Sequence, residues 1–185
     1  MKENNFTNKL IAAVLLIAAI WAIYFVDWII PYDFERLGIL PRHISGLKGI
    51  LFSPFIHGDW LHLISNTAPL FFLTLTILVF YPRMALPVWL LSAVLGGGLV
   101  WLIGRTSYHI GASGIIYALA GFLIASGLFR RDFKSLAIAI IIFFLYGGIL
   151  WGVFPTVPWV SWEAHLSGFV IGVLLAYPFR HGARE

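Results

Sequence analysis

The sequence predicts an all-α membrane protein in which six transmembrane helices form a compact bundle. Of the 185 residues, 61% are hydrophobic and 11% are charged, whereas a soluble domain has about half apolar and about a quarter charged residues. A helix needs about 20 residues to span a bilayer. We expect one membrane domain over residues 1–185. The apolar residues gather in six segments, at about 10–30, 60–80, 85–104, 113–129, 135–153 and 164–179.

The first segment predicts a retained helix rather than a cleaved signal. Residues 10–30 follow Lys2 and Lys9, and they form a longer apolar run than a signal peptide carries, without a small-residue cleavage site. The connection over 31–59 is charged but also rich in Phe, Ile and Leu. This mixture is typical of a structured loop that lies in the membrane interface.

The fourth segment is short for a span, which predicts a dip into the protein before it. Residues 106–111 are polar or glycine, apart from Tyr108 and Ile110. Non-helical backbone at membrane depth requires surrounding protein or a water-filled cavity. We therefore expect a wet cavity, open to the outside, above Ser113.

The basic residues predict that both termini lie in the cytoplasm, because cytoplasmic loops carry an excess of Lys and Arg. The compact layout suggests the cytoplasmic membrane of a prokaryote. The small net charge of +4 sits mainly at segment ends, so we expect no nucleic-acid partner. With both termini inside, the inner ends hold eight basic residues (Lys2, Lys9, Arg83, Arg130, Arg131, Lys134, Arg180, Arg184) and the outer connections four (Arg36, Arg42, Lys48, Arg105).

Three polar residues on three segments are expected at one depth. Ser113 precedes Arg130 by 17 residues, His165 precedes Arg180 by 15, and Asn66 precedes Arg83 by 17. At 1.5 Å per residue, all three lie about 22–26 Å from the inner boundary. The hydrocarbon core is about 30 Å thick, so this level is recessed from the outer face.

Ser113 and His165 are candidates for a nucleophile and its base. A serine hydroxyl needs a base within hydrogen-bond reach, and histidine exchanges protons near neutral pH. Gly111 and Gly114 would let backbone approach the hydroxyl. The alternatives are a small-residue packing patch around Ser113 and a histidine that only joins helices. Ala164, Gly168 and Gly172 form a small-residue stripe that would pull the sixth helix onto the fourth.

Other polar and aromatic residues could support this pair. His62 and Asn66 share one helix face, and with the Ser113 backbone N–H they could stabilise an oxyanion; the alternative is a polar ladder between helices. Tyr117 could pack on the His165 ring, or it could be ordinary aromatic core. His57, at the end of a loop, is expected to be structural or interfacial rather than catalytic.

Other protease chemistries lack their residues. The sequence has no cysteine and no His-Glu-x-x-His, and Asp27 is the only aspartate in a membrane segment, too few for an aspartyl dyad. Glu163 is two residues before His165 and would point away, so we expect a Ser–His dyad without a carboxylate. His57, His62 and His165 are too loosely spaced to favour a metal, and no cofactor is expected.

Together these motifs resemble the rhomboid family of intramembrane serine proteases. The resemblance rests on His57…His62-x-x-x-Asn66, Gly111-x-Ser113-Gly114 with Tyr117, and Ala164-His165-x-x-Gly168-x-x-x-Gly172. It implies a Ser113 nucleophile, a His165 base, and an oxyanion site from His62, Asn66 and the Ser113 backbone. It also implies cleavage of single-pass membrane proteins near the outer ends of their spans, usually at small residues, with lipid and these substrates as partners.

The resemblance further implies a lateral gate formed by residues 136–153 and the cap loop 154–162. The alternative is that the aromatic residues of this region, which are the candidate gate residues, only pack against one another. One departure concerns the first outer loop, where family members commonly carry a Trp-Arg pair. Here the region reads Gly46-Leu47-Lys48-Gly49-Ile50, so Lys48 replaces the arginine or the loop is anchored differently. The candidate gate residues are Phe143, Phe144, Trp151, Phe154 and Trp159.

Two other functions fit parts of the pattern. A non-catalytic protein that binds the spans of other membrane proteins would use the same polar residues as structural contacts. The joint presence of serine, histidine and two oxyanion candidates argues against it. A small transporter would need polar groups along a whole pore, but here they stop about one turn below Ser113.

Overall fold

The structure is a computed structural model that describes residues 3–181, and within that range the regular elements are helical apart from one isolated bridge between Ile39 and His109. A short π-helical turn, η4 (Ser92–Gly96), joins the helices Pro82–Leu91 and Gly97–Ile103, and η5 (Gly147–Val153) continues the helix Phe133–Tyr146 as a 3-10 helix. The main helices are α1 (Glu3–Ile29), α3 (Trp60–Phe80), α4 (Pro82–Leu91), α5 (Gly97–Ile103), α6 (Ser113–Arg130), α7 (Phe133–Tyr146) and α8 (Trp162–Ala176).

Five of the predicted spans are confirmed as helices long and apolar enough to cross a membrane. The sixth predicted segment forms α8, which has 15 residues and is about 22 Å long, shorter than the hydrocarbon core. The chain is therefore an all-helical integral membrane protein, while the sixth crossing stays a prediction. The five helices cover Phe6–Ile29, Trp60–Phe80, Pro82–Ile103, Ser113–Arg130 and Phe133–Val153.

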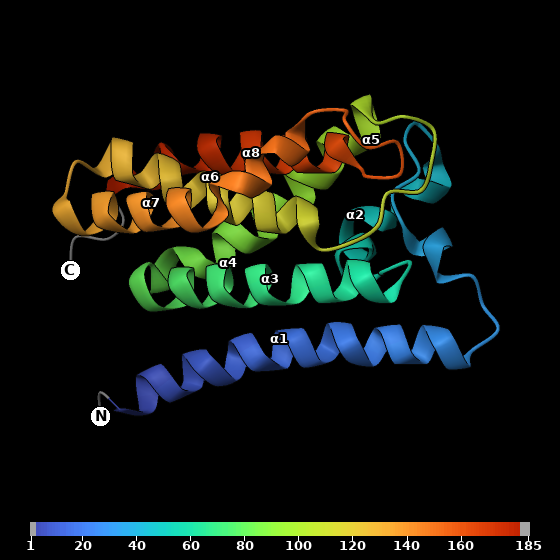
Figure 1. The fold of residues 1–185 in the computed structure, drawn as a ribbon, viewed down its shortest axis with the longest axis horizontal. Helices are drawn as coiled ribbons and strands as arrows, with labels where there is room; N and C mark the ends of the chain where they lie inside the picture. Colours follow the sequence, from blue (N-terminus) through green and yellow to red (C-terminus); the bar gives the residue numbers. More distant parts are fainter. Residues whose placement is uncertain (1–2, 182–185) are drawn as a thin grey trace.

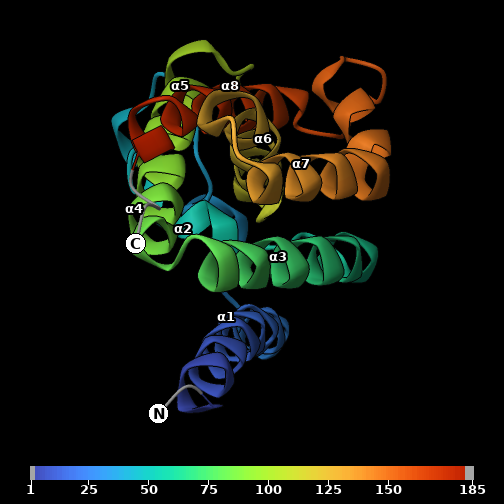
Figure 2. The ribbon, with the colours of Figure 1, turned by 90° about the vertical axis from the view of Figure 1, so that its left-hand side faces the viewer.

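Helix α6 lies at the centre of the bundle (Figures 1 and 2). Of the residues in its apolar window, 72% are buried, compared with 11% for α1. Helices α3, α7 and α8 and the turn η4 all pack against α6. Helix α1 packs on the outer side of α3, away from the rest of the bundle (Figure 2). The helix that begins with Ser113 is thus the best-shielded element of the fold.

Helices α6 and α8 touch backbone to backbone. A Cβ atom on Gly168 would lie 2.9 Å from the carbonyl carbon of Gly114, and one on Gly172 would lie 2.7 Å from that of Ala118. Such distances leave no room for any side chain, so the two glycines let α8 approach α6 more closely than other residues would. This packing fixes the start of α8 beside the start of α6.

The connection between α1 and α3, which is the predicted first outer loop, consists of short helical turns: η1 (Phe34–Leu37), η2 (Ile44–Gly46), α2 (Gly49–Phe52) and η3 (Ser53–Phe55). Arg42 anchors it by donating to the carbonyl of Gly104 at 2.7 Å and to Thr106 Oγ1 at 3.1 Å. Trp101 Nε1 donates to the carbonyl of His43 at 2.9 Å. Lys48 is exposed. The loop is therefore anchored through Arg42 and Trp101, and its place in the membrane interface stays a prediction.

Asp132 caps α7 at the end of the bundle where α1 begins (Figure 1). Its carboxylate accepts hydrogen bonds from the backbone N–H of Ser135 at 2.9 Å and from the Ser135 hydroxyl at 2.8 Å. The hydroxyl of Tyr81 donates to the same Ser135 oxygen at 3.1 Å. The cap thus joins α7 to the turn between α3 and α4.

Replacing Asp132 by alanine should destabilise the protein by about 1 kcal/mol at pH 7, the usual cost of losing an N-cap. The hydrogen bond from the Ser135 backbone lowers the pKa of Asp132, so its stabilisation is complete above the unfolded pKa of about 3.9 and is lost as pH falls through the folded value. Thermal unfolding in detergent should show the variant and the wild type converging below about pH 4. The control is Asp33→Ala, because Asp33 forms an exposed ion pair with Arg36 in the loop after α1. A destabilisation that persisted undiminished at low pH would contradict the ionised cap.

Candidate active site

The structure brings Ser113 and His165 together. Ser113 is the first residue of α6 and His165 lies in the first turn of α8, and His165 Nε2 is 2.9 Å from Ser113 Oγ. The other ring nitrogen, Nδ1, is 3.0 Å from the carbonyl oxygen of Gly152. A carbonyl only accepts, so Nδ1 carries the hydrogen and Nε2 is free to accept the Ser113 hydroxyl proton. The pair can exchange a proton without rearrangement.

The loop before α6 turns sharply at Gly111, whose φ is +104°, a conformation that glycine adopts at little cost. Its N–H donates to the carbonyl of Ser53 at 2.9 Å, and the next N–H, of Ala112, points to His57 Nε2 at 3.5 Å. The N–H of Ser113 stands at the first position of the helix, where no intrahelical acceptor exists. It is therefore available to an oxygen atom beside the Ser113 hydroxyl.

His62 and Asn66 converge on the same turn from α3. A Cβ atom on Gly111 would lie 2.6 Å from His62 Cε1 and 3.5 Å from Asn66 Nδ2. Asn66 is 7% exposed, and its Nδ2 has no hydrogen-bond partner among the described residues. A buried donor without a partner is costly, and this one lies beside the backbone that leads into Ser113. The Asn66 amide and the His62 ring can therefore both donate to an oxygen atom that becomes negatively charged beside Ser113.

Tyr117 stacks on the ring of His165. The two rings are 4.1 Å apart and nearly parallel, at 7°. The Tyr117 hydroxyl donates to the carbonyl of Ile149. The stack restrains the imidazole plane, while the hydroxyl reaches the η5 segment that also supplies the Gly152 carbonyl.

His57 is buried behind the site, with 1% of its surface exposed. Burial lowers the pKa of His57 to about 4, so the ring is neutral at pH 7 and Nε2 can accept the Ala112 N–H. Its ring lies edge-on to that of His62, with 4.9 Å between centroids. His57 therefore supports the loop that presents Ser113. Within residues 3–181, no three His, Cys, Asp or Glu side chains are grouped as metal ligands.

One connection that sequence reasoning missed runs through His109. Its Nδ1 is 2.5 Å from Ser161 Oγ and its Nε2 is 3.0 Å from the carbonyl of Arg105. Burial lowers the pKa of His109, so the neutral ring donates from Nε2 and accepts the Ser161 proton at Nδ1. Ser161 also caps α8 by accepting from Ala164 N–H at 3.3 Å. His109 thus ties the loop before Ser113 to the start of the helix that bears His165.

Glu163 strengthens the same tie. Its Oε1 accepts the backbone N–H of Arg105 at 3.2 Å and lies 3.4 Å from Arg105 Nε. The sequence predicts that Glu163 points away from His165, but it indicates no partner for the carboxylate. The signal that could have flagged it is a charged residue directly before an apolar segment.

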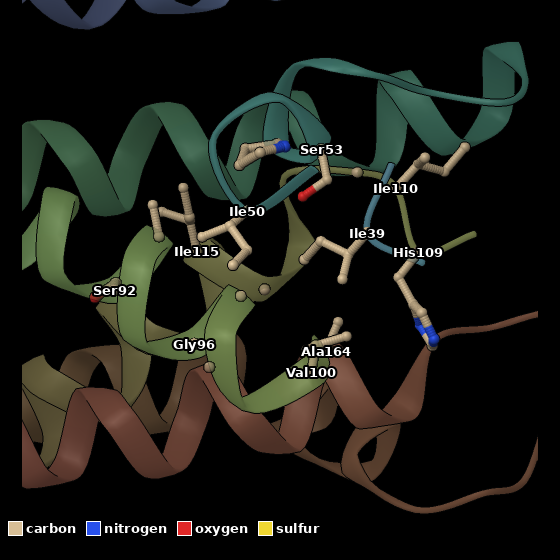
Figure 3. A pocket seen from close by; sticks show the side chains of 16 residues that line it. Ile39, Ile50, Ser53, Ser92, Gly96, Val100, His109, Ile110, Ile115 and Ala164 are labelled. Atoms are coloured by element: carbon tan, nitrogen blue, oxygen red, sulfur yellow. The ribbon is translucent and has the colours of Figure 1, made fainter. Parts of the chain in front are cut away.

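A small cavity lies behind the site, between the first outer loop, η4 and the starts of α6 and α8 (Figure 3). Its volume is about 30 Å³, and Ser53, His109 and Ala164 are among the side chains that line it. This volume suffices for a water molecule.

The aromatic residues of the expected gate lie on the outside of the bundle. Phe144 on α7 is 79% exposed, Trp151 on η5 is 73% exposed and Trp159 in the cap loop is 86% exposed. None of them is held in the core, so this part of the surface is available to lipid or to another membrane segment. Their role as a gate stays a prediction.

The comparisons with known proteins point to one family. The family model described as Rhomboid domain matches residues 45–182. An uncharacterized protein of Mycobacterium tuberculosis is 37% identical over 172 residues, which cover 87% of this chain and 71% of the relative, and one of Mycobacterium bovis matches equally well. An uncharacterized protein of Mycobacterium leprae is 35% identical over 171 residues, covering 86% of this chain and 67% of the relative.

Proposed function

This chain belongs to the rhomboid family, and on that premise we propose that it is an intramembrane serine endopeptidase that cleaves single-pass membrane proteins near the outer ends of their spans. The observation that carries the proposal is the 2.9 Å contact between Ser113 Oγ and His165 Nε2. It joins two residues 52 positions apart at the starts of two closely packed helices. A hydroxyl and an imidazole in this relation are the parts that acyl transfer requires.

The proposed reaction begins when Ser113 Oγ attacks the scissile carbonyl carbon and its proton passes to His165 Nε2. The tetrahedral intermediate collapses as the C–N bond breaks, and the proton on Nε2 goes to the leaving amine. The ester on Ser113 is then attacked by a water whose proton His165 accepts. A second collapse returns the proton to Ser113 Oγ and releases the carboxylic acid.

Three hydrogen-bond donors would stabilise the oxyanion of each tetrahedral intermediate. The Ser113 N–H lies at a helix N-terminus, where the positive end of the dipole favours negative charge. Asn66 Nδ2, buried and without a partner among the described residues, and the His62 ring approach the same turn from α3. Preorganised donors in a site shielded from water act more strongly than solvent does.

The substrate class follows from where this chemistry lies. Helix α6 begins inside a membrane protein, away from the end at which α1 begins and α8 ends (Figure 1). Because six of the ten basic residues in the described part of the chain lie at the opposite end, we place both termini in the cytoplasm and the site toward the outside, in a prokaryotic cytoplasmic membrane. A peptide bond at that level belongs to the outer end of another transmembrane span.

The rival from another class is a non-catalytic protein that binds the spans of other membrane proteins. It would need no hydrogen bond between a serine and a histidine, and no unpartnered amide donor beside them. The exposed aromatic surface of α7 and η5 would serve either function. The serine–histidine geometry therefore favours the protease.

Cleavage in reconstituted vesicles tests the proposal. Purified protein would be mixed in liposomes with a set of tagged single-pass membrane proteins, and the products would be mapped by mass spectrometry. We expect cuts between small residues in the outer part of a span. Binding of these substrates by the folded protein, with no cut in any of them, would favour the rival.

Removing an oxyanion donor should slow turnover without abolishing it. Asn66→Ala and His62→Ala should each lower kcat by about 10²–10³-fold, the effect of losing one such donor, while KM changes little because the charge develops only in the transition state. Ser65→Ala, an exposed residue of the same helix, is the matched control. Unchanged kcat in both variants would remove His62 and Asn66 from the oxyanion site.

A further inference from the structure

The base of the dyad is oriented by backbone. Among the described residues, the hydrogen-bond partners of the His165 ring are Ser113 Oγ and the carbonyl oxygen of Gly152. In serine proteases with a triad, a carboxylate on Nδ1 sets the tautomer and orientation of the histidine. Glu163, the nearest carboxylate in sequence, is turned toward Arg105. The position that a third catalytic group would occupy is therefore filled by a carbonyl.

We propose that the Gly152 carbonyl is the positioning group of this active site, and that the dyad is set for proton transfer only while η5 is closed over His165. The inference rests on the proposed protease function. It assigns a role to a residue that carries no side chain and to the segment that continues α7.

The local geometry requires glycine at this position. A Cβ atom on Gly152 would collide with the Tyr117 hydroxyl and would lie 3.1 Å from His165 Nδ1 and 3.2 Å from Tyr117 Cζ. The two other glycines of η5 differ, since a Cβ on Gly147 or on Gly148 would meet nothing within 4 Å. Only at Gly152 must the backbone come close enough for its carbonyl to reach the imidazole.

Segment η5 is held to the site at two points. The carbonyl of Ile149 accepts from the Tyr117 hydroxyl, and the carbonyl of Gly152 accepts from His165 Nδ1. No side chain of η5 is buried, and Trp151 is 73% exposed. An outward movement of η5 would therefore release both contacts together. It would leave the His165 tautomer undetermined and the stack with Tyr117 less restrained.

This arrangement links access to chemistry. A membrane segment that reaches Ser113 past α7 must displace or adapt to η5, and the base is realigned only when η5 returns. A binding event that left η5 open would not be followed by rapid acylation. The carbonyls of Ile149 and Gly152 connect the position of η5 to the alignment of His165, so no side chain of η5 is needed for this coupling.

The test compares Gly152→Ala with Gly148→Ala. Detergent-purified proteins would react with a fluorophosphonate probe, which needs an activated serine and no membrane substrate. We expect Gly152→Ala to label about 100-fold more slowly, the effect of a misplacement of about 1 Å, and Gly148→Ala to label at the wild-type rate. Both variants should unfold at similar temperatures. Equal labelling rates in the two would overturn the proposal.

A rescue variant keeps the test decisive if Gly152→Ala folds poorly. Tyr117→Phe removes the oxygen nearest to the added methyl group and keeps the ring that stacks on His165. We expect Gly152→Ala combined with Tyr117→Phe to recover labelling relative to Gly152→Ala alone, although Tyr117→Phe by itself slows the reaction. No recovery in a folded double variant would contradict the steric explanation.

Histidine nitrogen NMR separates this inference from the proposed function. In 15N-histidine-labelled protein, His165 should show protonated Nδ1 and unprotonated Nε2 in the wild type and in Gly148→Ala, and a tautomer mixture in Gly152→Ala. This spectrum requires no enzymatic activity. A wild-type protein that gave the expected spectrum but no labelling would refute the protease and keep the carbonyl contact. An unchanged His165 spectrum in Gly152→Ala would refute the positioning role in an active enzyme.

Discussion

Replacing Ser113 by alanine is expected to lower cleavage by about 10⁶-fold, the loss seen when a serine protease is deprived of its nucleophile. His165→Ala should cost about as much, and the double variant no more than either single one, because the two residues act as one unit. Initial rates of substrate cleavage in vesicles measure all three. The fold should be retained, because the alanine removes only one hydroxyl at the start of α6.

Ser126→Ala is the matched control for this loss. Ser126 lies on the same helix, is fully buried, and its hydroxyl has no hydrogen-bond partner among the described residues. Its loss should leave cleavage unchanged. Wild-type-like cleavage by Ser113→Ala would mean that another residue performs the attack.

Replacing Gly172 by leucine is expected to have the largest effect on stability. A Cβ atom there would already lie 2.7 Å from the carbonyl carbon of Ala118 and 2.9 Å from its Cα, so α8 must move away from α6. Overpacking of a core costs about 1–3 kcal/mol and sometimes more, and contact between two helix backbones leaves little room to relax. We expect a loss of about 3 kcal/mol, at the upper end of that range.

The same variant should also uncouple the dyad, because His165 stands seven residues before Gly172 on the helix that is displaced. Thermal unfolding and labelling of Ser113 would be measured together. Val170→Leu is the control, since Val170 is 38% exposed on another face of α8 and can accept an extra methylene. Wild-type unfolding and labelling in Gly172→Leu would show that α8 is not held against α6 as described.

Much of the fold could be predicted from the sequence because the membrane imposes a simple pattern. Five of the six apolar segments form helices long enough to span, and the depth count placed Ser113 and His165 at one level, where they meet. The glycine spacing Gly168-x-x-x-Gly172 predicted the close approach of α8 to α6. These features depend on periodicity and hydrophobicity, which are local properties of the chain.

The features that could not be predicted depend on contacts between distant segments. Every residue has a backbone carbonyl, so the sequence alone does not indicate that the carbonyl of Gly152 reaches His165. The pairing of Glu163 with Arg105 and of His109 with Ser161 joins segments that are 52 to 58 residues apart. The anchoring of the first outer loop by Arg42 likewise spans about 60 residues to the end of α5. Loop geometry of this kind follows from tertiary packing.

The central claim is that Ser113 is an activated nucleophile and His165 its base. Covalent labelling of the detergent-purified protein by a fluorophosphonate probe tests it most directly, with Ser113→Ala and His165→Ala treated in parallel. The account predicts that the wild type is labelled at Ser113 and that neither variant is labelled. Labelling that survives in the folded Ser113→Ala protein would contradict it.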